Sequence, residues 1–267
     1  MYRNDLRGRE MKIGIIGKGT VGSAVFEGLE YLGHTMTFFD PKHEGSNMSD
    51  VLDTDVVFVS VPTDQAANGD CDTSIVDNVV AELDINNYPG LVSIKSTVIP
   101  GTTDRLQKMY PALRMSMVPE FLRAKSALAD FVYNHDLLVV GTYNREDADV
   151  IVELHGSFPQ HVARVTPTEA EVIKYFNNVH HAMSVTFANI AYDVCDKLGA
   201  NYMNVYKAIV KRECFNPAYL MANKNMRGYG GHCLPKDTAA WNNLIQNLGL
   251  PYTMIDSIIQ DNKRVKK

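Results

Sequence analysis

Hydrophobic and polar positions alternate in one way up to about residue 165 and in another way beyond it. In the first part, short apolar runs are separated by amphipathic stretches. Apolar runs of four to six residues are typical of strands buried on both faces of a sheet. We expect strands at 11–16, 35–39, 56–61, 91–95, 113–118, 136–141 and 161–165. Helical patterns between them predict an α/β fold, a Rossmann-type, mostly parallel sheet covered on both faces.

From Thr168 the pattern becomes helical and no further strand is expected. Residues 169–198 contain no strong helix breaker, and their apolar residues recur at helical spacing. At about 1.5 Å per residue this helix would be about 45 Å long, which suits a spine between domains or a dimer face. Shorter helices are expected at 201–213, 237–247 and 253–265. The sequence therefore predicts two domains, a sheet domain over 1–167 and an all-α domain over 168–267.

A glycine-rich turn follows the first expected strand. Gly17, Gly19 and Gly22 are spaced as GxGxxG, a helical pattern starts there, and the next strand ends on Asp40. In such a unit the first glycine makes the tight turn, the second lets the backbone approach a pyrophosphate, and the third packs helix on strand. The acid accepts from ribose hydroxyls, and its charge disfavours a 2′-phosphate. Strand, glycines, helix and acid together indicate a site for NAD rather than NADP.

Polar residues also follow three later strands. Pro62 and Thr63 come after the strand at 56–61, Thr97 after the strand at 91–95, and Glu120 after the strand at 113–118. In parallel sheets, ligands bind beyond the carboxyl ends of the strands. One such residue would be ordinary, but several at one edge indicate a site.

The most unusual stretch of the helical half is a glycine-rich turn that carries a cysteine. Cys233 follows Gly230 and Gly231, and Lys236 and Asp237 come within four residues of it. A nearby cation stabilises a thiolate and makes the thiol a better nucleophile. Taken alone, the stretch also fits a loop whose cysteine is buried and inert.

Composition narrows the possible functions. The chain has 267 residues, of which 45% are hydrophobic and 21% charged, as in ordinary globular proteins. A net charge of -5 without a basic run argues against nucleic acid as a partner. No apolar run approaches the roughly 20 residues that span a bilayer, so no membrane partner is expected. The four cysteines lack CxxC spacing, so we expect no metal, no disulfides and a cytoplasmic location.

Taken together, these motifs resemble the nucleotide-sugar 6-dehydrogenase family, the UDP-glucose and GDP-mannose dehydrogenases. The matching residues follow the family's order between residues 11 and 240. They are Gly17, Gly19, Gly22, Asp40, Val61-Pro62-Thr63, Lys95-Ser96-Thr97, Pro100-Gly101-Thr102-Thr103, Pro119-Glu120-Phe121-Leu122-Arg123, Lys174, Asn177-Asn178 and Gly230-Gly231-His232-Cys233-Leu234-Pro235-Lys236-Asp237.

The resemblance implies an NAD-dependent oxidation of a nucleotide-sugar C6 alcohol to the acid, with two NAD consumed. Cys233 would be the nucleophile, Lys174 and Asn178 would stabilise the oxyanion, and Glu120 would be the general base. Thr97 and Asp237 would hold the catalytic water. The implied cofactor-binding residues are Gly17, Lys18, Gly19, Thr20, Val21, Asp40, Pro62, Thr63, Thr97 and Lys236. The implied substrate-binding residues are Glu120, Phe121, Leu122, Lys174, Asn178 and Gly230.

The chain departs from the family in several places. Family members are longer and carry a third, Rossmann-like domain that helps bind the nucleotide, whereas this chain ends at Lys267, about where that domain would begin. Ala124 stands where a second glutamate is usual, and Ile190 where a glutamate often follows the helix asparagine. The residues around Cys233 combine features of enzymes for different sugars, so the sugar is left open.

Three functions are therefore considered. The first is an active nucleotide-sugar 6-dehydrogenase, a homodimer through the helix at 169–198. The second is a β-hydroxyacid dehydrogenase, which also pairs a Rossmann domain with a helical one but needs no cysteine nucleophile. The third is a relative that only binds NAD or a nucleotide sugar, or that works with a partner supplying the missing domain.

Overall fold

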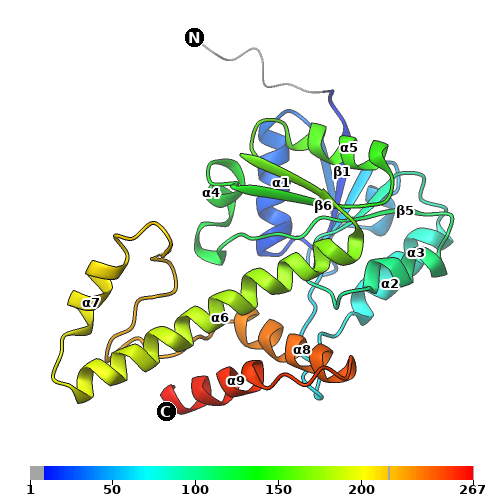
Figure 1. Cartoon of the computed structure of the whole chain (residues 1–267). Helices are drawn as coiled ribbons and strands as arrows, with labels where there is room; N and C mark the ends of the chain where they lie inside the picture. The colour runs from blue at the N-terminus through cyan, green and yellow to red at the C-terminus, as the bar shows by residue number, and fades with distance from the viewer. Residues whose placement is uncertain (1–8, 216, 267) are drawn as a thin grey trace, which may run out of the picture. The chain divides into compact units, whose positions relative to one another are not determined.

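The computed structural model describes residues 9–215 and 217–266 (Figure 1). The chain forms two compact units. The first unit runs to Asp64 and resumes from Asp72 to Lys174, whereas the second comprises Gln65–Cys71 and the chain from Tyr175 onward. The division into domains at 167/168 stays a prediction.

The first unit is built on a seven-stranded sheet. Its strands are β1 (Lys12–Ile16), β2 (Thr35–Phe39), β3 (Val56–Val59), β4 (Leu91–Ile94), β5 (Arg114–Met117), β6 (Leu137–Gly141) and β7 (His161–Val165). Their order is β2-β1-β3-β4-β5-β6-β7. Every neighbouring pair is parallel except β5 and β6. The predicted Rossmann-type, mostly parallel sheet is thus confirmed.

Helices cover both faces of this sheet (Figure 1). On one face, α2 (Ser74–Ile85), α3 (Thr102–Met109) and the 3₁₀ turn η1 (Met48–Val51) pack in a cluster with Val57, Val92 and Met115. On the other face, α1 (Thr20–Tyr31), α4 (Ala127–Val132) and α5 (Arg145–His155) pack against Ile13, Phe58 and Val140. Alternate residues of each strand face opposite layers, so continuous apolar runs were the correct sequence signal.

Four neighbouring strands end level with one another. Ile16 of β1 pairs with Val59 of β3, Val59 with Ile94 of β4, and Ile94 with Met117 of β5. The residues that follow these strands therefore emerge along one edge. Because β2 and β3 lie on opposite sides of β1, the order in which strands are added to the sheet reverses there, which is where open α/β sheets bind ligands.

The second unit is helical. It holds most of α6 (Pro167–Lys197), together with α7 (Tyr202–Ile209), α8 (Cys233–Asn247) and α9 (Met254–Val265). Val179 of α6, Ile245 of α8 and Ile255 of α9 form one apolar cluster. A second cluster joins Ala188 of α6 to Tyr202 of α7. Within the described residues, every helix is too short or too polar to cross a membrane.

The helix expected at 237–247 begins four residues earlier, at Cys233. Pro235 lies inside its first turn. A proline is tolerated there because the first N–H groups of a helix have no partner within the helix. Conversely, α7 ends at Ile209, short of the expected residue 213.

Substitution of Phe131 would test how closely the helices α1 and α4 pack in the first unit. Its ring is fully buried, and a Cβ added at Gly28 of α1 would lie 2.3 Å from it, so α1 and α4 are in close contact. We expect Phe131→Ala to lower the free energy of unfolding by about 3–5 kcal/mol, measured by chemical denaturation followed by circular dichroism. Leu128→Ala on the same helix removes a side chain that is 40% exposed and should cost less than about 1 kcal/mol. Equal losses in the two variants would contradict this account of the core.

Candidate functional site

The glycine turn after β1 has the geometry of a dinucleotide site. Gly17 has φ +90°, and a Cβ there would lie 2.7 Å from the carbonyl oxygen of Ser60. A Cβ at Gly22 would lie 2.0 Å from the carbonyl oxygen of Gly17, whereas one at Gly19 would meet open space. Helix α1 starts at Thr20 without a side-chain cap. The first N–H groups of α1 are thus suited to hold phosphate oxygens, beside an open approach at Gly19.

Asp40 closes this turn from the end of β2. Its carboxylate accepts from the backbone N–H of Lys18 at 2.8 Å and of Lys42 at 2.9 Å. The ammonium of Lys18 lies 3.9 Å from the ring centroids of both Phe26 and Phe38. The carboxylate oxygens keep lone pairs for further donors, so Asp40 can hold the turn and also accept from ribose hydroxyls. These residues fit NAD.

The ends of β3 and β4 are tied together next to this turn. The Ser96 hydroxyl donates to the carbonyl oxygen of Val61 at 2.7 Å. Thr63 is buried and Thr97 is partly buried at the same edge. Pro62 and Thr63 thus follow β3, the neighbour of β1 and its glycine turn, whereas Thr97 follows β4, one strand further along the sheet.

Glu120 lies just beyond β5, and both its carboxylate and its backbone carbonyl accept hydrogen bonds. Its Oε2 atom lies 2.9 Å from the ammonium of Lys95, which also donates to the carbonyl oxygen of Val118 at 3.4 Å. Its Oε1 atom accepts from the backbone N–H of Phe121, and its backbone carbonyl accepts from Lys174 Nζ at 2.5 Å. Burial alone raises the pKa of Glu120. The charges of Lys95 and His135 and the hydrogen bonds that it accepts outweigh burial, so the pKa lies below its ordinary value.

The segment after Glu120 is anchored to both faces of the sheet. Phe121 packs on the α2 and α3 side and Leu122 on the α1 and α4 side. The guanidinium of Arg123 binds the carboxylate of Asp130 at 2.6 Å, and this pairing lowers the pKa of Asp130. The backbone at Glu120 is thereby fixed.

In the second unit, Cys233 is the first residue of α8 and its side chain is exposed. Gly228 and Gly231 before it have positive φ, +65° and +76°, which glycine adopts at little cost. The exposed side chain contradicts the alternative of a buried cysteine, and the reactivity of the thiol stays a prediction.

One turn further along α8, Lys236 and Asp237 form a buried pair. Their side chains are 7% and 1% exposed, with Nζ and Oδ1 2.8 Å apart. Asn178 of α6 donates to the other Asp237 oxygen at 2.5 Å, and Lys236 Nζ lies 3.6 Å from the sulfur of Cys71. Burial alone lowers the pKa of Lys236, but the neighbouring Asp237 and Cys71 raise it above its ordinary value.

The expected site residues fall into two sets, one in each unit. The first unit brings together the glycine turn, Asp40 and the strand ends. It also joins Glu120 to Lys174. The second unit brings together Asn178, Lys236 and Asp237 near the start of the helix that carries Cys233. The expectation that Cys233 faces the carboxyl edge of the sheet stays a prediction.

Two residues of these sets were missed in the sequence. Lys95 was recognised only as part of a motif and given no role, and its own signal was weak, a lysine directly after the four buried residues of β4, three of which are apolar. Cys71 gave none, because a single cysteine in a polar stretch has no informative spacing. Gln65–Cys71 belongs to the second unit, where Asn243 donates to the backbone oxygen of Asn68 and to Asp70.

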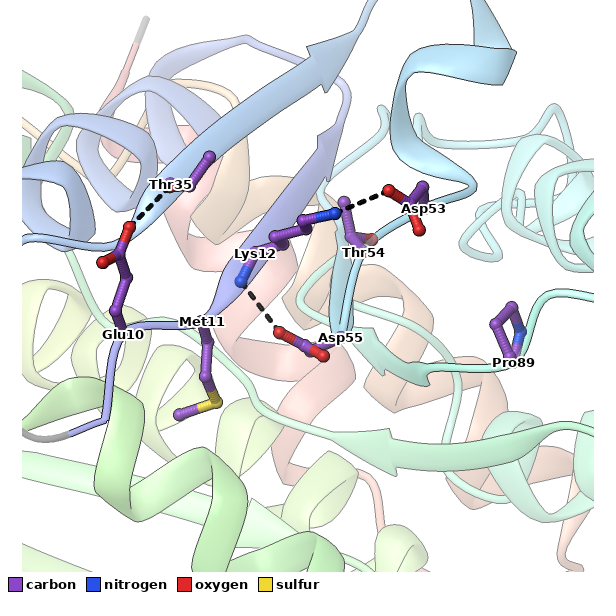
Figure 2. Close-up of a pocket in the computed structure, with 8 residues that line it drawn as sticks. All are labelled: Glu10, Met11, Lys12, Thr35, Asp53, Thr54, Asp55 and Pro89. Carbon is purple, nitrogen blue, oxygen red and sulfur yellow. Dashed lines mark hydrogen bonds and ion pairs between the residues drawn. The ribbon is translucent and has the colours of Figure 1, made fainter.

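A polar pocket lies at the opposite, amino-terminal edge of the sheet (Figure 2). Lys12 at the start of β1 is paired with exposed Asp53 at 2.6 Å, and its backbone N–H donates to Asp55. Glu10 accepts from the hydroxyl of Thr35. These polar groups are hydrogen-bonded or ion-paired with one another, so we do not propose this pocket as the functional site. Across the described residues, no group of three His, Cys, Asp or Glu side chains is placed to hold a metal ion.

A doubly covered sheet with this glycine turn and acid defines a dinucleotide-binding protein. The chain belongs to the UDP-glucose/GDP-mannose dehydrogenase family. The model of that family's NAD binding domain matches residues 43–159, and the model of its central domain matches residues 168–264. NAD is accordingly the cofactor.

Curated relatives support the same family. The chain is 29% identical to the UDP-glucose 6-dehydrogenase of Rickettsia bellii over 95% of its own length and 67% of that protein. It is also 29% identical to the GDP-mannose 6-dehydrogenase of Pseudomonas aeruginosa, over 79% of its own length and 51% of that protein. The chain thus spans about half to two thirds of the length of these relatives.

A solved structure agrees. The UDP-glucose dehydrogenase of Pyrobaculum islandicum superimposes with a TM-score of 0.86 at 25% identity. The match covers 99% of this chain and 70% of that one.

The buried pair in the second unit gives a test of stability. Removing Lys236 leaves the Asp237 carboxylate buried without its cation, so we expect Lys236→Met to lower the free energy of unfolding by about 3–5 kcal/mol. Urea unfolding followed by the fluorescence of Trp241, the single tryptophan, reports on this unit because Trp241 lies on α8 and stacks on Tyr175. The exposed pair of Arg264 with Asp261 is the control, and Arg264→Met should cost less than about 1 kcal/mol. A Lys236→Met loss no larger than the control would show that the pair is not needed for stability.

Proposed function

We propose that this chain is an NAD-dependent nucleotide-sugar 6-dehydrogenase, which oxidises the C6 alcohol of its substrate to the acid through a cysteine thioester. The observation that carries the proposal is the start of α8. There an exposed thiol, Cys233, is followed within four residues by the buried pair of Lys236 and Asp237, inside the region that matches the family's central domain.

The thiol acts after the first oxidation, in which the C6 carbon loses a hydride and the hydroxyl proton passes to water, leaving an aldehyde. The Cys233 thiolate adds to the carbonyl carbon of the sugar aldehyde, and the resulting oxyanion is the group that Lys174 and Asn178 would stabilise by donating hydrogen bonds. NAD, when bound, accepts a hydride at each of the two oxidations. Loss of the second hydride leaves a thioester on Cys233.

Hydrolysis then releases the product. A water attacks the thioester carbonyl carbon, its proton passes to Glu120, the carbon–sulfur bond breaks and the thiolate leaves. Thr97 and Asp237 would hold the water. The buried Asp237 is already oriented by Asn178, and the ionised Glu120 is able to accept a proton.

Two other functions were considered. Membership of the nucleotide-sugar family favours the proposal over a β-hydroxyacid dehydrogenase. A role that depends on a partner, or on binding alone, is the other alternative. UDP-glucose and GDP-mannose relatives match with equal identity, so the sugar is not assigned. A cytoplasmic location also stays a prediction.

Substitution of the thiol tests the proposal. We expect the wild-type protein to produce two NADH per sugar from NAD and one of a panel of UDP- and GDP-sugars. Cys233→Ser should lose acid formation by at least about a thousandfold, because it removes the nucleophile. The exposed Cys214 provides the control, and Cys214→Ser should keep wild-type stoichiometry. Acid formation that persists in Cys233→Ser would rule out the thioester. NAD binding without turnover of any sugar would support the binding-only alternative.

We further propose that the chain forms a homodimer through α6. The second unit exposes Phe176, Phe187, Ile190, Val194 and Leu198, between 44% and 77%. Phe187, Ile190, Val194 and Leu198, the residue directly after α6, follow one another at spacings of three and four. Phe176 lies eleven residues, about three turns, before Phe187, so all five lie on one apolar stripe. Large apolar side chains concentrated on one helix face are typical of an interface.

A charge placed in the stripe tests the dimer. We expect Phe187→Lys to convert the dimer to a monomer in light scattering after size exclusion, because a lysine would be buried unpaired at the interface. Asp196 lies about half a turn around α6 from Phe187 and is exposed, so Asp196→Lys adds the same residue away from the stripe. A wild-type monomer, or a dimer unaffected by Phe187→Lys, would contradict this interface.

A further inference from the structure

The least expected feature of the first unit is a buried ion pair between the ammonium of Lys95 and the carboxylate of Glu120. The Lys95 side chain is fully buried and that of Glu120 is 6% exposed. Lys95 follows β4 and Glu120 follows β5, and these strands are neighbours whose ends lie level. The pair is therefore positioned by the register of the sheet together with the short segment after β5, which Phe121, Leu122 and Arg123 anchor.

The ammonium of Lys95 is surrounded by two hydrogen-bond acceptors and an aromatic ring. Nζ donates to Glu120 Oε2 at 2.9 Å and to the carbonyl oxygen of Val118 at 3.4 Å, and it lies 5.2 Å from the ring centroid of Phe58. The Glu120 oxygen that does not contact Lys95 accepts from the N–H of Phe121. A carboxylate oxygen can accept more than one hydrogen bond, so each still has a lone pair for a water.

We infer that Lys95 is a positioning residue for the hydrolytic step, and that its buried ammonium holds the Glu120 carboxylate ionised and in one orientation. The inference rests on the proposed function, in which Glu120 takes a proton from water. Lys95 itself contacts neither substrate nor cofactor in this account. It acts through Glu120.

Other charged and titratable groups face this pair from the elements around it. His135, after α4, lowers the pKa of Glu120, and Lys174 of α6 donates to the Glu120 backbone oxygen. His155 of α5 is fully buried, and burial together with Lys95 and His135 keeps its pKa well below the ordinary value. Burial likewise lowers the pKa of His135. Both shifts disfavour the charged imidazoles, whereas Lys95 Nζ contacts a Glu120 oxygen directly at 2.9 Å, so Lys95 is the main cation at this carboxylate.

The sign of the effect follows from these contributions. Burial raises the pKa of Glu120, and the Lys95 charge is the largest influence against it. Without Lys95, Glu120 binds a proton at higher pH and cannot act as a base until the pH exceeds the raised value. An opposite charge at this distance shifts a carboxyl pKa by about 1–3 units, so the acid limb of kcat should move up by that amount.

The test measures the Glu120 carboxyl directly and the reaction separately. Carboxyl titration by infrared difference spectroscopy, with Glu120→Gln to identify the band, should show Glu120 ionised below its ordinary pKa in the wild type. In Lys95→Met the band should titrate about 1–3 units higher. The acid limb of kcat should shift by the same amount, with activity recovered at high pH, and Lys95→Arg should keep the wild-type profile. Lys12→Met, which removes an exposed lysine from the opposite edge of the same sheet, should change neither.

Each outcome bears on the inference. A wild-type Glu120 that titrates at or above its ordinary pKa overturns it, as does a titration that Lys95→Met leaves unchanged. If Lys95→Met fails to fold while Lys95→Met combined with Glu120→Gln folds, the unpaired carboxylate is the cause, and the inference is supported. If no sugar is turned over, the proposed function fails, yet the carboxyl titration still decides whether Lys95 keeps Glu120 ionised.

Discussion

The level register of four parallel strands is the constraint on which the first unit depends. Because β1, β3, β4 and β5 end together, the glycine turn, Ser96, Lys95 and Glu120 emerge at one edge of the sheet. A slip of one residue would turn each side chain to the other face and remove the Lys95–Glu120 contact. Core packing fixes this register, since alternate residues of each strand enter different apolar clusters. The chemistry of the edge therefore depends on the core.

Much of the fold could be predicted because its signals are local. Apolar runs located all seven strands to within about two residues at their ends, and the glycine spacing located the start of α1. The end of α7 and the start of α8 were less predictable. The start of α8 was obscured by Pro235, since a proline ends most helical patterns but is accepted in a first turn.

Residues of the candidate site were predictable only where they belong to a motif with a recognisable spacing. Gly17, Asp40 and Cys233 were found from spacing, whereas Lys95 and Cys71 depend on contacts between residues distant in the chain. Lys95 meets Glu120 across 25 positions, and Cys71 meets Lys236 across 165. No local pattern encodes such distances, because they arise from strand order and from the placement of the short segment Gln65–Cys71 with the second unit.

Both units bury an ammonium against a carboxylate, and stability alone does not account for either pair. Desolvating two charges costs several kcal/mol, and apolar residues of equal volume often serve a core as well or better. A buried ion pair does what an apolar pair cannot, since it keeps a carboxylate charged, oriented and away from bulk water. Glu120 beside Lys95 and Asp237 beside Lys236 are the two acids to which the proposed reaction assigns work on water. The cost of burial is thus explained if the charge itself is needed at both positions.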